Sequence, residues 1–114
     1  MVYIESAVFT ARLQQLAGEA ALDVLSRIQS DLLKNPEGGD VVPGLGGIRK
    51  ARIGNPTRGK GKRGGYRYLF LYLENRRHIH LLFLLDKNEQ VDLSQEERRN
   101  LRALVAAIKQ SVTK

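Results

Sequence analysis

Hydrophobic residues in the first third of the chain recur every three or four positions, the spacing of a helix with one buried face. After a short β-favouring start at residues 2–4, the first such series ends near Gly18, a residue suited to a helix C-cap. It consists of Phe9, Leu13 and Leu16. A second helix is predicted over residues 19–34 and ends before Pro36, because proline disfavours helix for the residue that precedes it. Its predicted apolar stripe is Leu22, Leu25, Ile28 and Leu32.

In the middle of the chain the pattern changes to the alternation of hydrophobic and polar residues that is typical of strands. Residues 36–47 are rich in glycine and proline and are predicted to form turns. Residues 74–77 are predicted to form a tight hairpin turn, in which Asn75 is expected to supply the positive φ. The three predicted strands cover residues 48–53, 66–73 and 78–85.

The last element is predicted to be a helix from about residue 94 to 111. Ser94 as N-cap and Glu97 three residues later match a capping box, which satisfies two otherwise unpaired backbone N–H groups. Its apolar stripe is Leu101, Leu104, Val105 and Ile108. The order strand, two helices, three strands, helix (β-α-α-β-β-β-α) predicts an α+β fold over residues 1–114, one domain, with the helices packed on one face of a small antiparallel sheet.

The composition narrows the classes of protein to consider. With no cysteine among the 114 residues, a disulfide framework, a zinc-thiolate site and a thiol nucleophile are excluded. The longest apolar runs, such as residues 79–85, are far shorter than a membrane span. The N-terminus lacks the basic region and long apolar run of a signal peptide, so we expect a cytoplasmic protein without membrane contact.

The basic charge is concentrated in one segment. The formal net charge is +7, but residues 1–48 carry −3, residues 49–87 carry +9 and residues 88–114 carry +1. Such a basic segment within a nearly neutral frame points to a polyanionic partner, with nucleic acid as the first choice. The alternative is a basic surface that serves only to keep the chain in solution.

The loop of residues 54–65 combines five glycines with four basic residues, a composition that lets backbone and charge approach phosphate groups. Its candidate RNA-binding residues are Arg58, Lys60, Lys62 and Arg63. A nucleotide-hydrolysing P-loop is excluded, because Gly61 stands where the Mg²⁺-binding Ser or Thr belongs and the loop joins two strands. The alternative is a hairpin loop without a partner.

Three cations are predicted to meet on adjacent strands. Lys50 and Arg52 lie two residues apart and so project from the same strand face, and Arg67 opens the strand expected to pair with theirs. Such a cluster suits a phosphodiester, for which the neighbouring Arg49 is a further RNA-binding candidate. The alternative is neutralisation by a carboxylate, for which Asp86 and Glu89 are the candidates.

Histidines and tyrosines give weaker signals. His78 and His80 share one face of a strand with leucines, which favours a structural role over an acid–base pair. They are too few for a metal site, so no metal or other cofactor is expected. The tyrosines of residues 66–72 favour core packing, although Tyr66, beside the basic loop, is a candidate for stacking on an RNA base.

Three runs together resemble the HigB branch of the RelE toxin superfamily. They are PGLGGIRKARI, GKGKRGGYR and KNEQVDLSQEE, and the resemblance covers roughly residues 3–110. It implies the toxin of a type II toxin–antitoxin system, an endoribonuclease that enters the ribosomal A site and cuts mRNA without a metal. It also implies a cognate antitoxin, with a helix-turn-helix domain as in HigA-like partners, so that DNA is contacted only through the antitoxin.

The resemblance also assigns catalytic roles, to Lys50, Arg52, Arg67 and Lys87. In RelE a further arginine follows the last of these lysines and a tyrosine lies six residues beyond; here the two positions hold Asn88 and Ser94. The general acid is therefore not assigned. Independently of the family, cleavage through the 2′-hydroxyl needs a base, an acid and cations on the phosphate, which suits Lys50 as base and the two arginines as phosphate clamps.

Two other functions remain open at this point. A ParE-like toxin that targets gyrase has the same fold, although the clustered cations argue against it. A non-catalytic protein that binds RNA or the ribosome would use the same cationic surface, because such a surface serves binding as well as cleavage.

Overall fold

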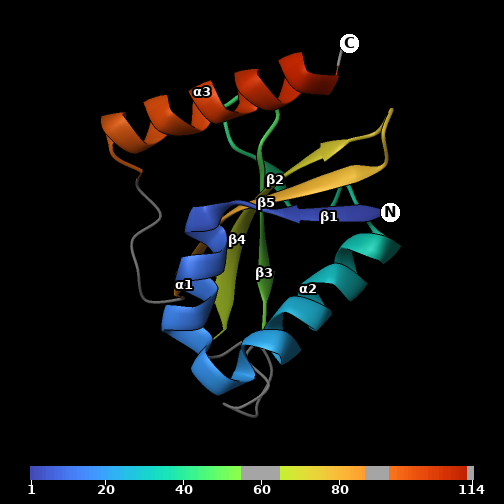
Figure 1. Cartoon of the computed structure of the whole chain (residues 1–114), viewed down its shortest axis with the longest axis vertical. Helices are drawn as coiled ribbons and strands as arrows, with labels where there is room; N and C mark the ends of the chain where they lie inside the picture. The colour runs from blue at the N-terminus through green and yellow to red at the C-terminus, as the bar shows by residue number, and fades with distance from the viewer. Residues whose placement is uncertain (55–64, 87–92, 113–114) are drawn as a thin grey trace.

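The computed structural model describes residues 1–54, 65–86 and 93–112 of the chain. In chain order its elements are β1 (Val2–Glu5), α1 (Ala7–Ala17), a 3₁₀ turn η1 (Gly18–Ala20), α2 (Ala21–Lys34), β2 (Asp40–Val41), β3 (Arg49–Ile53), β4 (Tyr66–Leu73), β5 (His78–Asp86) and α3 (Gln95–Val112). The predicted element order is confirmed, with β2 added inside the segment predicted to be turns (Figure 1).

The sheet has five strands in the order β1-β5-β4-β3-β2. The three predicted strands, β3, β4 and β5, pair antiparallel as expected. Strand β1 joins the edge of β5 in parallel, and β2 adds two residues to the outer edge of β3. The sheet is therefore mixed, whereas the sequence predicted a purely antiparallel one.

Helices α1 and α2 cover one face of the sheet. The N-cap of helix α1 is Ser6, whose Oγ accepts a hydrogen bond from the Phe9 N–H at 3.0 Å and donates one to the Leu82 carbonyl at 2.9 Å. The cap thus also attaches the helix to β5. The helices and strands that meet here bury a cluster that includes Phe9, Leu13, Val24, Ile28, Leu32, Tyr68, Phe70 and Leu81. Leu22, predicted to be buried, is 81% exposed, since the buried face of α2 runs through Ala21, Val24, Ile28 and Leu32.

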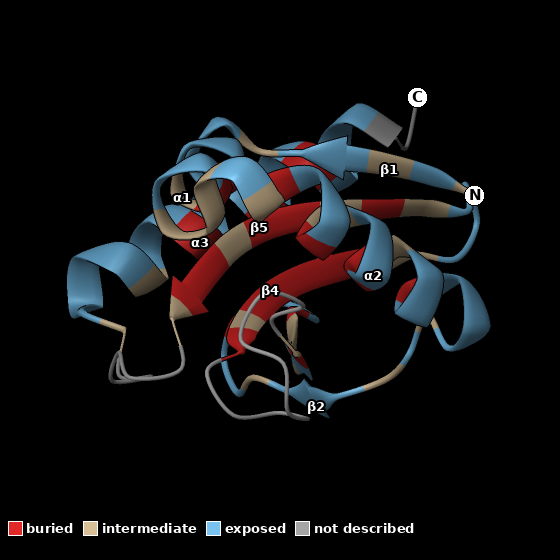
Figure 2. Cartoon of the chain, turned by 90° about the horizontal axis from the view of Figure 1, so that it is seen from below, coloured by how far each residue is buried: buried red, intermediate tan, exposed pale blue. Residues whose placement is uncertain are grey.

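Helix α3 packs on the opposite face, so the expectation that all helices share one face is wrong. Strand residues alternate between the two faces, and those of the second face pack with α3 in a separate buried cluster. It consists of Leu45, Ile48, Leu69, Leu71, Leu82, Leu101, Val105 and Ile108. Seen from below, buried residues run along β4 and β5 between the helices (Figure 2). The predicted capping box is confirmed: the Glu97 N–H donates to Ser94 Oγ at 3.0 Å, and the Ser94 N–H to Glu97 Oε1 at 2.9 Å.

The hairpin between β4 and β5 turns differently from the prediction. The residue with positive φ is Arg77, at 55°, and not Asn75. The Arg76 and Arg77 N–H groups donate to the Leu73 and Glu74 carbonyls, both at 3.2 Å. No helix within the described residues has both the length and the apolar character needed to cross a membrane.

Candidate functional site

A cavity of about 580 Å³ lies where the end of α2, the segment before β2, and strands β3 and β4 meet. Its lining is mostly polar and charged, unlike the rest of the space between helices and sheet. The lining residues are Asp31, Leu32, Lys34, Asn35, Gly38, Gly39, Asp40, Lys50, Ala51, Arg52, Arg67 and Tyr68. Three of the four residues predicted to be catalytic are thus in one cavity.

The sheet register explains how these three cations meet. Arg52 on β3 lies directly opposite Arg67 on β4, and Lys50, two residues before Arg52 on β3, lies opposite Leu69. Side chains of residues directly opposite in an antiparallel pair start about 5 Å apart at Cβ. The strand pairing therefore brings Lys50, Arg52 and Arg67 together, as the sequence predicted.

Two carboxylates that the sequence did not suggest, Asp31 and Asp40, line the cavity. Asp40 on β2 lies directly opposite Lys50, and Asp31 and Lys34 reach the same cavity from the last turn of α2. Asp86 lies opposite Tyr66, and Arg67 lies opposite Leu85. The side chains of Asp86 and Arg67 therefore start on opposite faces of the sheet. Glu89 lies outside the described residues. The cavity therefore carries charges of both signs.

These charges are not paired with one another. Within the part of the chain that the structure describes, no hydrogen bond or ion pair joins the side chains of Asp31, Lys34, Asp40, Lys50, Arg52 and Arg67 to other residues. Asp40 and Lys50 are cross-strand neighbours, but their charged ends do not come within ion-pair distance of each other. The register also separates these charges: the three cations share the sheet face of Leu69, which packs with α3, whereas Asp31 acts on Tyr68 on the opposite face.

Two glycines allow the backbone to approach β3 closely at this site. A Cβ on Gly39, whose φ is +72°, would lie 2.2 Å from the Lys50 carbonyl oxygen. A Cβ on Gly65 would lie 2.2 Å from the Ile53 carbonyl oxygen. Any side chain would force these segments away from β3. The glycines therefore fix the distance of β2 and of the start of β4 from the cationic strand.

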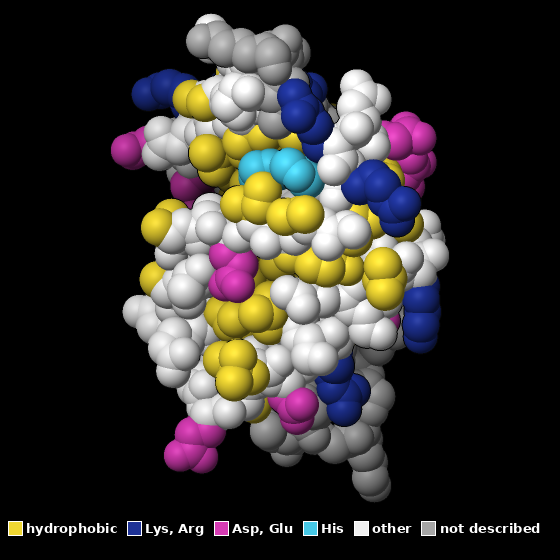
Figure 3. Space-filling view, turned by 45° about the vertical axis from the view of Figure 1, so that its right-hand side comes forward, with side chains coloured by type: hydrophobic (Ala, Val, Ile, Leu, Met, Phe, Trp, Pro, Cys, Tyr) yellow, Lys and Arg dark blue, Asp and Glu magenta, His cyan; other side chains and the backbone are white. Residues whose placement is uncertain are grey.

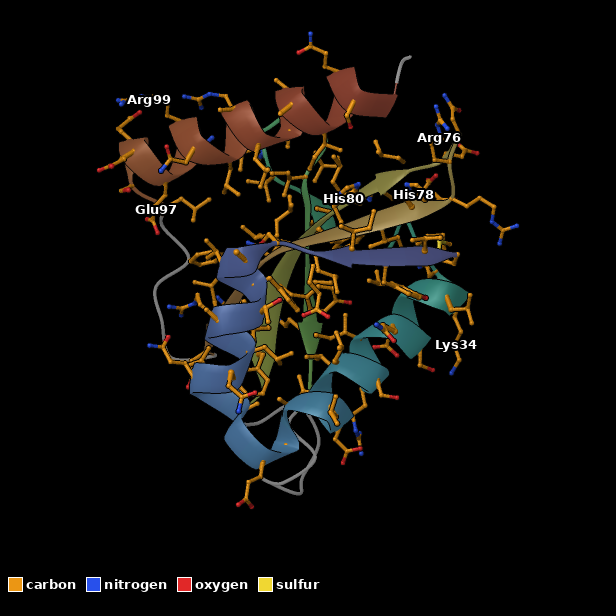
Figure 4. The ribbon with its side chains drawn as sticks, viewed as in Figure 1. Lys34, Arg76, His78, His80, Glu97 and Arg99 are labelled. Carbon is orange, nitrogen blue, oxygen red and sulfur yellow. The ribbon has the colours of Figure 1, made fainter. Side chains whose placement is uncertain are left out.

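Tyr68 forms part of the cavity wall although its side chain is only 2% exposed. Burial, and secondly the charge of Asp31, raise the pKa of its hydroxyl well above 10.0, so Tyr68 stays neutral at physiological pH. The carboxylate of Asp31 therefore lies near the hydroxyl of the buried Tyr68. Figure 4 shows Lys34 at the end of α2, on the far side of the sheet from α3.

Two predicted RNA contacts lie elsewhere. Arg49 faces a separate small cavity with Glu74, and its guanidinium donates a hydrogen bond to the Glu37 carbonyl at 2.8 Å. Tyr66 is 2% exposed, packs in the core beneath α1 and α2, and donates a hydrogen bond to the Leu16 carbonyl at 3.3 Å. The prediction that Tyr66 stacks on a base is therefore wrong, because its ring is covered by the protein's own side chains.

The remaining predicted site residues lie outside the described residues. They are Lys87, which follows the last residue of β5, and the four basic residues of the loop between β3 and β4, Arg58, Lys60, Lys62 and Arg63. The described ends of that loop, Gly54 and Gly65, lie next to the strand positions of Arg52 and Arg67.

The histidines lie away from the cavity. His78 and His80 are opposite Leu73 and Leu71 on β4, on the face covered by α3, and Figure 4 shows both on β5. Figure 3 shows histidine among hydrophobic side chains. Burial, and secondly the charge of His78, lower the pKa of His80 below 6.5, and its Nε2 is buried without a hydrogen-bond partner. Within the described residues no group of three His, Cys, Asp or Glu side chains could hold a metal ion.

Sequence reasoning missed Asp31, Lys34 and Asp40. The two-residue strand β2 gave no alternating pattern, and helix α2 reaches the cavity only through the tertiary packing of its last turn. The one available signal was Asp40-Val41 between glycine-rich turns, which is short for a strand but compatible with pairing at an edge.

The model of one protein family, described as the RelE toxin of the RelE/RelB toxin–antitoxin system, matches residues 10–114. The chain belongs to the RelE toxin family. The family consists of toxins from toxin–antitoxin systems, which implies an antitoxin as a partner of this chain. It is similar in fold to a double-arginine mutant of the E. coli toxin RelE in the free state, with a TM-score of 0.59, 10% identity, and coverage of 91% of this chain and 95% of that one.

A second solved structure gives the same result. The isolated E. coli RelE toxin matches with a TM-score of 0.55 and 11% identity, over 97% of this chain and 98% of that one. At such low identity these two similarities concern the fold alone. The RelE-type α+β fold predicted from the sequence is confirmed.

Proposed function

We propose that this RelE-family toxin is a ribosome-dependent endoribonuclease of the HigB-like branch, which inhibits translation by cutting mRNA in the ribosomal A site without a metal. The observation that supports it most strongly is the cavity in which Lys50, Arg52 and Arg67 converge with their charges unpaired by the described residues. A phosphodiester supplies the negative charge that this cluster lacks.

The proposed reaction is an attack within the RNA strand. A base takes the proton of the 2′-hydroxyl, the 2′-oxygen forms a bond to the adjacent phosphorus, and the bond from phosphorus to the 5′-oxygen breaks. The leaving oxygen takes a proton from an acid, and the upstream product ends in a 2′,3′-cyclic phosphate. Negative charge builds on the phosphate oxygens in the transition state, where fixed cations stabilise it most.

Lys50 takes the role of base in this scheme, because it lies beside the two arginines that hold the phosphate. Arg52 and Arg67 clamp the phosphate from adjacent strands, each through a planar group that can hold two oxygens. The proton for the leaving group comes from Lys87, from Lys62 or Arg63 of the basic loop, or from the ribosome.

The proposed partner in the cell is an antitoxin with a helix-turn-helix DNA-binding domain, encoded next to the toxin and acting with it in the cytoplasm. A cationic toxin surface attracts an acidic antitoxin segment, which would neutralise it before it reaches the ribosome. Co-expression with the adjacent small reading frame should restore the growth of cells that express the toxin.

Toeprinting on a translated mRNA, combined with induced expression in bacteria, tests the function. The proposal expects cuts within codons in the A site and a fall in intact mRNA as growth stops. Intact mRNA together with arrested DNA replication would identify a gyrase-targeting toxin. Intact mRNA with stalled ribosomes would identify a binder without catalysis. Either result overturns the proposal.

A further inference from the structure

A second cavity, of about 410 Å³, lies between the start of α1, strand β5 and the first half of α3. Its lining is mostly apolar, unlike that of the cationic cavity, and includes Val8, Leu82, Phe83, Leu101 and Leu104. Val8 and Leu104 are 52% and 37% exposed, so apolar surface around this space is open to a ligand. Figure 4 shows Glu97, which also lines the cavity, at the start of α3.

Phe83 places this cavity on the same face of the sheet as the cations. It lies directly opposite Leu69 on β4, and Leu69 lies directly opposite Lys50 on β3. Arg67 precedes Leu69 by two residues and is thus a diagonal neighbour of Phe83, about 7–8 Å away and within reach of an aromatic side chain. Phe83 and Leu69 also pack in the same cluster with α3. The aromatic ring and the cationic cluster are therefore adjacent on one surface.

The ring of Phe83 is held in place from outside the cavity. The guanidinium carbon of Arg12, on α1, lies 5.0 Å from the ring centroid, and its Nε donates a hydrogen bond to the Leu84 carbonyl. Phe83 is partly buried and lines the cavity, whereas Arg12 does not line it. Part of a fixed aromatic ring therefore faces an apolar space, and unpaired RNA bases are bound by stacking on such rings.

Asn100 supplies a polar group at the same cavity. Its side chain is exposed and, within the part of the chain that the structure describes, its amide makes no hydrogen bond. A side-chain amide both donates and accepts, so it can bind the polar edge of a base. An apolar lining with few polar groups, at this volume, is typical of sites for small organic ligands.

We propose that this cavity receives a nucleobase of the mRNA whose phosphate is held by Lys50, Arg52 and Arg67, with the base stacked on Phe83 and its edge bound by Asn100. This inference rests on the proposed function, since it assigns the base site of the same RNA. A protein segment is the other occupant to consider. The position of Phe83 beside Arg67 favours RNA, because one strand then reaches both the cations and the ring.

Messages that lack one base test the proposal by single-turnover cleavage on programmed ribosomes. An abasic nucleotide is placed at each position of the A-site codon in turn. It retains the sugar, the 2′-hydroxyl and the phosphates, so only the stacking and the edge contacts are lost. For the wild type, we expect cleavage to be about tenfold slower or more at one position, as the loss of stacking on an aromatic side chain predicts.

Variants of Phe83 and Asn100 identify the site of the effect. Phe83→Leu keeps a large apolar side chain without an aromatic face, and should slow cleavage of the intact message by a similar factor while the abasic message keeps its wild-type rate. Phe83→Tyr, which keeps the ring, should cleave both messages as the wild type does. Asn100→Ala should slow cleavage of the intact message only, by a smaller factor.

Two matched controls should behave as the wild type on both messages. Tyr72→Leu removes a partly buried aromatic ring from the opposite face of the sheet, where Tyr72 packs with the α1 and α2 cluster. Gln95→Ala removes an exposed amide of α3 that does not line the cavity.

Each result decides for or against the assignment, provided that the variant has the circular dichroism of the parent. Equal cleavage of intact and abasic messages by the wild type at all three positions overturns it. So does an equal slowing of both messages in Phe83→Leu, which would identify a structural role. Should Phe83→Leu fail to fold, the same comparison with Asn100→Ala decides.

The two remaining outcomes concern the protein partner and the function itself. Parental cleavage by Phe83→Leu together with lost neutralisation by the antitoxin would assign the cavity to a protein segment and overturn the proposal. If the wild type cleaves no message on the ribosome, the proposed function fails first and this inference fails with it.

Discussion

Arg52 and Arg67 lie directly opposite each other on the antiparallel strands β3 and β4. No described carboxylate forms an ion pair with either guanidinium. Like charges in directly opposed positions destabilise a sheet. This arginine pair lowers the stability of the sheet. We infer that its role is to bind an anion, which offsets the repulsion when it is bound.

Arg52→Gln should therefore stabilise the fold while it impairs function. We expect the free energy of unfolding to rise by about 0.2–1 kcal/mol, the range for removing an unfavourable cross-strand pair. Urea denaturation at low ionic strength measures this gain. Arg99→Gln, which changes an exposed arginine on α3 (Figure 4), is the control and should change stability little. A loss of stability in Arg52→Gln would show that the arginine pair is not repulsive.

If the proposed function is correct, binding to the ribosome should depend strongly on salt, because the proposal has several phosphates contacted at once. Neutralising the loop residues Lys60, Lys62 and Arg63 together should weaken binding and flatten the plot of log affinity against log salt concentration. Titration of ribosome binding over a range of potassium chloride concentrations provides the measurement. Affinity that does not respond to salt in the wild type would identify a protein surface as the target.

Arg77→Asn should stabilise the β4–β5 hairpin. Arg77 adopts a φ of 55°, a left-handed conformation that costs most residues about 1 kcal/mol and that asparagine adopts more readily. We expect a gain of up to about 1 kcal/mol in the free energy of unfolding. Thermal unfolding with Arg76→Asn as the neighbouring control checks the prediction. An equal gain in both variants would attribute the effect to charge and not to backbone conformation.

His80 should make the fold less stable in mild acid. Burial, and secondly the charge of His78, lower the pKa of His80 below 6.5, so the unfolded chain binds a proton that the folded chain resists. Stability therefore falls as the pH decreases through 6.5 and is retained above it. His80→Leu should reduce the fall in melting temperature between pH values of about 7.5 and 5.5. An unchanged pH dependence in His80→Leu would place the responsible group elsewhere.

The sequence predicted those parts of the fold that local patterns determine. The strand of residues 66–73 coincides with β4, and the capping box of Ser94 and Glu97 forms as expected. The cationic side of the cavity was also predictable, because the spacing of Lys50 and Arg52 and the position of Arg67 after the glycine pair are local features.

The parts that failed depend on contacts between distant segments. The parallel addition of β1 to β5 and the position of α3 on the second face follow from how elements pack, which no local pattern encodes. The pairing of Asp40 with Lys50 brings together segments ten residues apart through a two-residue strand. Tyr66 was misplaced because alternation predicts which face a residue occupies but not which helices cover that face.

Single-turnover cleavage of a defined mRNA on programmed ribosomes, measured for Arg67→Ala and Lys50→Ala beside the parent, tests the central claim most directly. Each variant must match the circular dichroism of the parent, and ribosome binding is measured in parallel. If these cations act on the transition state, the cleavage rate should fall by on the order of 100-fold or more, with a much smaller change in affinity. A single-turnover rate that stays at the parental value in Arg67→Ala would contradict the assignment of this cavity as the catalytic site.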